Sequence, residues 1–389
     1  MAIIKRVRKT YKYRLYQNDK RNRHLVNQID IAGIIWNHSL ALQKRYYRLT
    51  GKYIRVHRLQ SHIAKQIRTR EKFAFWRKVG SQAIQDIVVR LDNAYQRFFD
   101  KKSGFPRFKK VKKYKSFTLK QKAGWKQLPD KREVRAKATG NGYHRGIGMV
   151  IIQKRVYKYV KHRPLNGKIQ TVTIKRDSIG RLWICFSVFE NIEIPEVSTS
   201  RIGGFDFGLS VFLTDHTGKK YKNPEYLKQD LPRIRSLNRS LSHKKKGSNN
   251  RRKTRYLLAR GHVRVDDKRR HFHYKQAHQL CKHYDVLVFE DLNIDGMKRL
   301  WGRKVSDLAF SQFLEIVQWV AEKQGKKVIL IGRFEATTQT CSNCGNKQKL
   351  KLSERIYDCP HCDLVLDRDH NAALNILCIG ASMHTARGD

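Results

Sequence analysis

The sequence predicts an α/β domain with an inserted zinc ribbon, preceded by a β-rich domain that is interrupted by a helical insert. Three observations support this prediction. Residues 286–289 and 327–331 are short apolar runs, typical of strands buried on both faces, and they alternate with helical patterns. Two Cys-x-x-Cys pairs follow between residues 341 and 362. Before residue 190, strand patterns flank a long helical stretch.

The N-terminal segment alternates between apolar and basic residues over residues 5–15. This period of two predicts a half-buried strand with a basic outer face. Apolar residues then recur at helical spacing through residues 20–100, with a break near Gly51. We therefore expect several helices in this stretch.

Short strand patterns return over residues 101–190. Residues 177–180 (DSIG) separate two of them and predict a hairpin. The next stretch, residues 190–200, contains three Glu and neither Lys nor Arg. Because this composition departs sharply from the basic chain around it, we place a linker at residues 191–200.

Strand and helix patterns alternate after this linker. Residues 224–282 are mostly helical and strongly basic, and KKKGSNNRRK is a flexible break within them. An amphipathic helix is expected over residues 307–324, and a last helix from about Asp369. Strands are expected at residues 202–206, 210–214, 219–221, 286–289 and 327–331.

The charge points to a polyanionic partner. The chain has 389 residues, with 84 Lys and Arg against 32 Asp and Glu, so its formal net charge is +52. Such an excess is self-repelling unless a polyanion such as nucleic acid neutralises it. A membrane surface is the rival, but no apolar run reaches the ~18–20 residues that span a bilayer. The N-terminus has no apolar signal region, so we expect a cytoplasmic protein.

The cysteine spacing predicts a metal site. Four of the seven cysteines form two Cys-x-x-Cys pairs separated by 14 residues: Cys341, Cys344, Cys359 and Cys362. Thiolate pairs of this kind bind Zn²⁺ tetrahedrally. Four Cys ligands leave no open position for water, so the zinc would be structural. Four free thiols without metal are the alternative.

Acidic residues stand at strand or helix ends of this acid-poor chain. Asp206 and Glu290 end two predicted strands, and Asp367 and Asp369 begin the last helix. Carboxylates brought together repel unless a divalent cation neutralises them. Two Mg²⁺ ions held there would activate water and stabilise the leaving oxygen of a phosphodiester. Taken singly, each acid could instead be a salt-bridge partner, a helix N-cap or a turn residue.

Four segments carry a family resemblance: GGFDFGLSVFLTD, LVFEDLNIDGM, TTQTCSNCG and CPHCDLVLDRDHNAALNIL. They resemble the three RuvC motifs and the zinc ribbon of the TnpB family. These are OrfB-type proteins of insertion sequences, related to compact type V CRISPR effectors. The resemblance covers residues 201–389 and extends more weakly into the N-terminal half.

The resemblance implies an RNase H-like (RuvC) nuclease domain at residues 201–335 and 364–389, with the zinc ribbon at 336–363. It implies a β-barrel-like wedge domain at residues 1–19 and 101–190, with a helical recognition domain at 20–100. The catalytic, Mg²⁺-binding trio would be Asp206, Glu290 and Asp369. In the family's D-R-D-x-N-A-A motif the second Asp is the metal ligand, which favours Asp369 over Asp367. One departure is Asp363, where the family's second knuckle often carries Gly.

The resemblance also implies an activity and partners. Family members resemble RNA-guided DNA endonucleases, which bind a transposon-derived guide RNA and act on double-stranded and single-stranded target DNA beside a short motif. Alternatives are a protein-only transposase or resolvase with the same site, and a non-cutting RNA-guided DNA-binding repressor. Candidate nucleic-acid contacts, each of which could instead be core or solvated surface, are Lys244, Lys245, Lys246, Arg251, Arg252, Lys253, Tyr53, Gln82 and Gln85.

Overall fold

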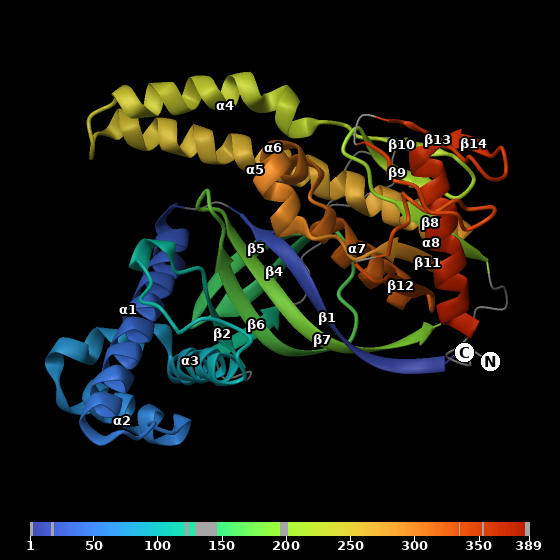
Figure 1. Cartoon of the computed structure of the whole chain (residues 1–389). Coiled ribbons are helices and arrows are strands. Elements are labelled where there is room, and N and C mark those ends of the chain that lie inside the picture. Colours follow the sequence, from blue (N-terminus) through green and yellow to red (C-terminus); the bar gives the residue numbers. More distant parts are fainter. Residues whose placement is uncertain are drawn as a thin grey trace. The chain divides into compact units, whose positions relative to one another are not determined.

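The computed structural model describes residues 3–16, 19–120, 124–128, 146–194, 201–333, 335–351 and 354–385. The chain divides into two compact units (Figure 1). The first consists of Arg6–Ile192, and the second of Met1–Lys5 together with Glu193–Asp389. Within the described part of the chain, no helix combines the length and hydropathy that crossing a bilayer requires.

The first unit is built on a barrel-like, seven-stranded sheet of order β2-β6-β7-β1-β5-β4-β3. As predicted, the first strand alternates: Tyr11, Tyr13 and Leu15 are buried, while Lys12 and Arg14 are exposed. The predicted hairpin joins β6 to β7. The strands are β1 (Ile3–Leu15), β2 (Ser116–Leu119), β3 (Trp125–Leu128), β4 (Gly146–Ile152), β5 (Arg155–Lys161), β6 (Lys168–Arg176) and β7 (Leu182–Ile194).

Helices occupy the interval between β1 and β2, as the sequence predicts. The break near Gly51 is real: α1 ends at Thr50, and Gly51 has a φ of +66°, which a residue without Cβ adopts readily. The elements are α1 (Asp19–Thr50), α2 (Val56–Thr69), the 3₁₀ helix η1 (Glu71–Val79), α3 (Ser81–Phe99) and the short 3₁₀ turn η2 (Val111–Lys113).

The predicted linker, residues 191–200, contains the boundary between the two units at Ile192 and Glu193, but its first residues form a strand. Strand β7 continues through residues 191–194, and less exposed and exposed side chains alternate over residues 190–193. Glu190, directly before these residues, accepts hydrogen bonds from Lys9 and Tyr11 of β1. The remaining linker residues, 195–200, lie outside the described part of the chain.

The second unit contains a five-stranded sheet of order β10-β9-β8-β11-β12. Its centre is parallel, since β11 pairs in parallel with both β8 and β12, while β9 and β10 form an antiparallel extension. The strands are β8 (Ile202–Asp206), β9 (Val211–Asp215), β10 (Lys220–Lys222), β11 (Val286–Glu290) and β12 (Lys327–Ile331). The helices are α4 (Tyr226–His243), α5 (Asn249–His283), α6 (Ile294–Leu308), α7 (Phe310–Lys323) and α8 (Arg368–Thr385).

The helix predicted over residues 307–324 is confirmed as α7, but the prediction begins three residues too early, in the last turn of α6. Ala309 adopts a left-handed conformation (φ +49°) and separates α6 from α7. Sequence reasoning missed α6, whose N-cap is Asn293: its side chain accepts a hydrogen bond from the N–H of Gly296. Buried Asp307 near its end accepts backbone hydrogen bonds from Leu227 and Lys228, so it caps the start of α4.

Helix α8 packs unusually closely on the sheet. A Cβ at Gly204 of β8 would lie 2.4 Å from the carbonyl oxygen of Ala373, and one at Gly380 would lie 2.4 Å from Val288. A Cβ at either position would force its neighbour to shift, so the two glycines allow this close approach. This approach fixes the start of α8 beside the end of β8.

Candidate active site and metal centre

Two of the predicted acids end neighbouring parallel strands. Phe205 of β8 is the register partner of Phe289 of β11, and Asp206 and Glu290 are the next residues. Parallel strands lie ~4.8 Å apart, so the two carboxylates emerge side by side at the carboxyl edge of the sheet. Asp206 is 7% exposed, and Glu290 is half-buried.

The third predicted acid, Asp369, lies in the first turn of α8. The close contact at Gly204 brings this turn to the end of β8. A Cβ built at Gly208, just beyond Asp206, would lie 3.7 Å from Oδ2 of Asp369. We call Asp206, Glu290 and Asp369 the carboxylate trio.

The electrostatics of Asp206 link the three acids. Burial raises the pKa of Asp206 well above its ordinary value, and the carboxylates of Asp369 and Glu290 raise it further. Arg368 and the N–H of Phe207 lower the same pKa but do not outweigh those effects. Burial also raises the pKa of Glu290 to about 7, with a smaller contribution from Asp291. A carboxyl group with a raised pKa is destabilised when it is charged, and a bound cation would stabilise the charged form.

Two acids next to the trio in the sequence, Asp367 and Asp291, each pair with a basic side chain. Burial alone would raise the pKa of Asp367, but Lys220, 2.6 Å away, and the N–H groups of His370 and Asp369 hold it below its ordinary value. Asp291 pairs with Arg333 at 2.8 Å. Asp367 therefore caps α8, whereas the carboxylate of Asp369 lies close enough to Asp206 to raise its pKa.

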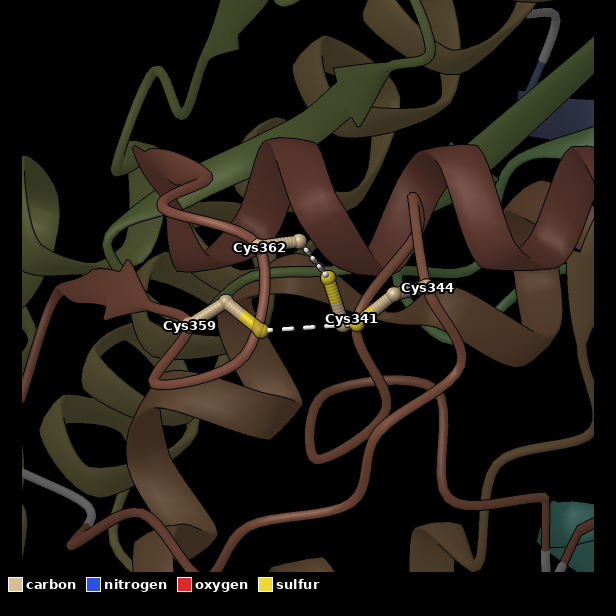
Figure 2. Close-up of side chains that lie close together, drawn as sticks. All are labelled: Cys341, Cys344, Cys359 and Cys362. Carbon is tan, nitrogen blue, oxygen red and sulfur yellow. Dashed lines mark hydrogen bonds between the residues drawn. The ribbon is translucent and has the colours of Figure 1, made fainter.

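The cysteine ribbon, residues 336–367, gathers the four predicted thiols. Figure 2 shows them turned toward a common centre: Sγ of Cys341 lies 3.6 Å from that of Cys362, and Sγ of Cys344 lies 3.6 Å from that of Cys359. All four sulfurs lie within 4.8 Å of one another, and none forms a disulfide. Tetrahedral ligands ~2.3 Å from zinc would be ~3.8 Å apart, so the donors fit that metal.

Backbone turns at the two knuckles explain the spacing of the cysteines. Gly345 follows the first pair with a φ of +75°, and its N–H donates to the carbonyl of Cys341. Asp363 takes the corresponding place in the second knuckle, at a φ of +53°. This left-handed conformation accounts for the family's frequent Gly there, and Asp is among the residues that tolerate it. The short strands β13 (Ile356–Asp358) and β14 (Val365–Asp367) complete the ribbon.

The basic residues predicted to contact nucleic acid surround the turn between α4 and α5. The break expected within the basic stretch is present between His243 and Asn249, and Ser248 caps α5 by accepting a hydrogen bond from the N–H of Arg251. Arg251 also donates to the carbonyl of Lys244, whose own Nζ donates to Thr254. The exposed members of the set are Lys245, Lys246, Arg252 and Lys253.

The other three candidates lie in the helical part of the first unit. The hydroxyl of Tyr53 donates to Asp92 at 2.7 Å, and its ring packs edge-on against Tyr95. Gln85 is exposed and lines a cavity of about 440 Å³ with residues of α2 and α3. Gln82 lines a neighbouring cavity of about 600 Å³.

Sequence reasoning missed three residues at or beside the start of α8. Lys220 holds Asp367, Nε2 of His370 donates to the carbonyl of His216, and the Arg368 guanidinium donates to the carbonyl of Lys351. Arg368 and His370 lie inside the D-R-D-H-N motif, which could have drawn attention to them. Lys220 is one lysine among many, and only the folding of β10 toward α8 identifies it.

Three family models match the chain. Their descriptions are "Helix-turn-helix domain" (residues 1–52), "Probable transposase" (residues 186–300) and "Cas12f1-like, TNB domain" (residues 310–376). The first description does not fit the local fold, because the described part of residues 1–52 is strand β1 followed by the single helix α1.

Similar proteins span most of the chain. A Streptomyces pristinaespiralis protein named "Putative RNA-guided DNA endonuclease" is 29% identical over 395 residues, covering 100% of this chain and 92% of that protein. The Escherichia coli K12 protein named "Putative RNA-guided DNA endonuclease InsQ" is 25% identical, covering 89% of this chain and 86% of that protein. The "TnpB-like protein L79" of Acanthamoeba polyphaga mimivirus is 29% identical over 57% of this chain and 46% of its own length.

Two solved structures share the fold. A cryo-EM structure of a Cas12f1–sgRNA–target DNA complex matches with a TM-score of 0.52 at 15% identity, covering 95% of this chain and 98% of that one. A mini-RNA-guided endonuclease, CRISPR-Cas_phi3, matches with a TM-score of 0.53 at 10% identity, covering 96% and 92%. The family models and the sequence relatives show that this chain is similar to TnpB-like and OrfB_IS605 proteins, and the two solved structures share its fold.

Proposed function

We propose that the protein is an RNA-guided, Mg²⁺-dependent DNA endonuclease of a transposable element, with a single RuvC-like active site at the carboxylate trio. One observation supports it most strongly. Asp369 and Glu290, which are 79 residues apart in the chain, both raise the pKa of buried Asp206 at the carboxyl edge of the parallel strands. A parallel sheet with α8 packed on it matches the expected RNase H-like arrangement.

Asp206, Glu290 and Asp369 would hold two Mg²⁺ ions. Bound there, the ions would activate a water molecule and stabilise the leaving oxygen of the scissile phosphodiester. The chain's own contribution is to fix the ligands. The stacked Phe205 and Phe289 beneath the strand ends set the spacing of Asp206 and Glu290, and Asp367 holds the first turn of α8. The ribbon cysteines would hold a structural Zn²⁺.

The nucleic-acid partners follow from charge and from the relatives. A net charge of +52 can neutralise many phosphates of a transposon-derived guide RNA and of double-stranded and single-stranded target DNA. Two relatives are named putative RNA-guided DNA endonucleases, and we extend RNA guidance from them to this chain. Guide pairing reads the sequence while the protein binds backbone and shape. In this proposal the sheet of the first unit forms the wedge domain and its helices form the recognition domain. The protein would act in the prokaryotic cytosol.

The test is to sequence the RNA that co-purifies with the protein and to assay cleavage of a matching DNA target in Mg²⁺. We expect a discrete RNA, cleavage by wild type, and none by Asp206→Ala, which should retain the RNA. Asp295→Ala is the charge-matched control, because Asp295 is exposed and pairs only weakly with Lys298 at 3.7 Å. Cleavage without any discrete RNA would support a protein-only transposase or resolvase. Target binding without nicking by wild type would support a repressor.

A further inference from the structure

Helix α8 begins directly after the cysteine ribbon. Strand β14 ends at Asp367, α8 starts at Arg368, and Asp369 is therefore the second residue of the helix. Whatever holds the first two turns of α8 sets the position of this carboxylate. One side of α8 packs on β8, through Ala373 and Gly204. The ribbon is held against α8 by different contacts.

Asn371 makes that connection with both ends of its side chain. Its Oδ1 accepts a hydrogen bond from the N–H of Ser342 at 2.9 Å, and its Nδ2 donates to the carbonyl of Thr340 at 2.8 Å. The residue is fully buried (0% exposed). Thr340 and Ser342 are the two neighbours of the thiol-bearing Cys341.

Asn375, one helical turn later on the same face, repeats the contact. Its Nδ2 donates to the carbonyls of Thr337 at 2.8 Å and Thr340 at 2.7 Å. A third contact comes from Arg368, whose guanidinium donates to the carbonyl of Lys351 at 3.1 Å. The ribbon is thus bound along α8 from its first residue to its second turn.

We propose that Asn371 and Asn375 are positioning residues that couple the folded cysteine cluster to the location of Asp369. The inference rests on the proposed function, in which Asp369 is a metal ligand. Zinc binding orders the first knuckle, the knuckle fixes the carbonyl of Thr340 and the N–H of Ser342, and these fix the first turns of α8. A buried amide without these partners would leave polar groups unsatisfied, so the arrangement tolerates little displacement.

The test uses Asn371→Ala and Asn375→Ala in the full-length protein with its RNA. Supporting side chains behind a metal ligand contribute ~10- to 100-fold to metal affinity. We expect Asn371→Ala to keep zinc and RNA, to bind Mn²⁺ at the trio about 10-fold more weakly, and to lose hydrogen-exchange protection in residues 368–376. Asn371→Asp retains the acceptor for Ser342 and should recover part of the protection. Ser382→Ala, which removes a side-chain hydrogen bond to a carbonyl elsewhere on α8, is the matched control.

Coupling is tested by combining variants. If Asn371 acts through the ribbon, chelation of zinc from wild type should reproduce the loss of protection, and chelation from Asn371→Ala should add little. Wild-type protection in Asn371→Ala, or independent effects of the two changes, would overturn the inference. The proposed function fails separately, when wild type binds Mn²⁺ no better than Asp369→Ala even though exchange shows the coupling.

Discussion

Phe205 and Phe289 are register partners on parallel strands, and their rings stack with centroids 5.1 Å apart and planes inclined by 23°. Asp206 and Glu290 follow them directly. The apolar pair therefore fixes how two carboxylates meet at the sheet edge, and burial beneath them raises both pKa values. The same packing that gathers the acids makes their charged forms unfavourable without a cation.

The first prediction concerns pH in the absence of divalent metal. Glu290 has a pKa of about 7 when folded, against 4.5 in the unfolded chain. Between those values the folded protein binds more protons, so the free energy of unfolding should fall as pH rises from 4.5 to 7. Asp206, whose pKa is also raised, contributes in the same direction.

Urea unfolding in EDTA across this pH range measures the effect. Glu290→Gln carries no ionisable group there, so its stability should exceed that of wild type increasingly toward pH 7. Mg²⁺ should remove most of the difference by stabilising wild type. Parallel curves for the two proteins in EDTA would contradict the prediction.

The second prediction tests the approach of α8 to the sheet. A Cβ in Gly204→Ala would meet the carbonyl of Ala373 at 2.4 Å and the N–H of Leu377 at 2.6 Å. Overpacking of this kind costs about 1–3 kcal/mol. Displacement of α8 should also reduce cleavage, because Asp369 moves with the helix. Chemical denaturation and a cleavage assay measure both effects.

Gly302→Ala is the control, since a Cβ at Gly302 in α6 meets nothing within 4 Å. Because Gly302 directly follows the kink at Trp301, this substitution should change the free energy of unfolding by no more than ~1 kcal/mol. Equal stability of the two alanine variants would show that the α8 contact is loose.

The sequence predicts these buried strands well and the helix boundaries beside them poorly. Strand β12 was predicted to its ends because it is a continuous apolar run, and β11 to within one residue for the same reason. The break at Ala309 leaves no such trace. Alanine rarely adopts a left-handed conformation, and the apolar residues Leu308 and Phe310 continue the helical pattern across it.

The candidate site was also only partly predictable from the sequence. The order of the three acids along the chain was readable, but the contrast between Asp367 and Asp369 depends on Lys220, which reaches α8 only through folding of β10. The predicted linker contains the boundary between the units, but its first four residues are strand, because Ile192 and Ile194 alternate with polar neighbours. Glu190 is acidic because it pairs with Lys9 across the sheet.

The third prediction concerns the cysteine cluster. Cys341→Ser should lose zinc and the order of the first knuckle, because metal binding supplies folding energy in sites of this kind. Cleavage should fall at least ~10-fold, in line with the loss of support for a metal ligand. Zinc content by a chromogenic chelator and cleavage in Mg²⁺ are the measurements. Cys378→Ser, an exposed cysteine of α8 outside the cluster, should match wild type in both. Full activity in zinc-free Cys341→Ser would refute the prediction.

The last prediction concerns the basic turn between α4 and α5. Lys253 is exposed beside Lys245 and Lys246, whereas Lys244 and Arg251 are engaged in the turn itself. If Lys253 neutralises one phosphate, Lys253→Ala should weaken RNA binding and reduce the slope of log K against log salt by ~0.7–0.9. Lys282→Ala removes an equal exposed charge at the far end of the same helix and controls for net charge. Filter binding of the purified RNA at several salt concentrations distinguishes them: identical slopes would mean that the turn is a solvated surface and that the phosphates bind elsewhere.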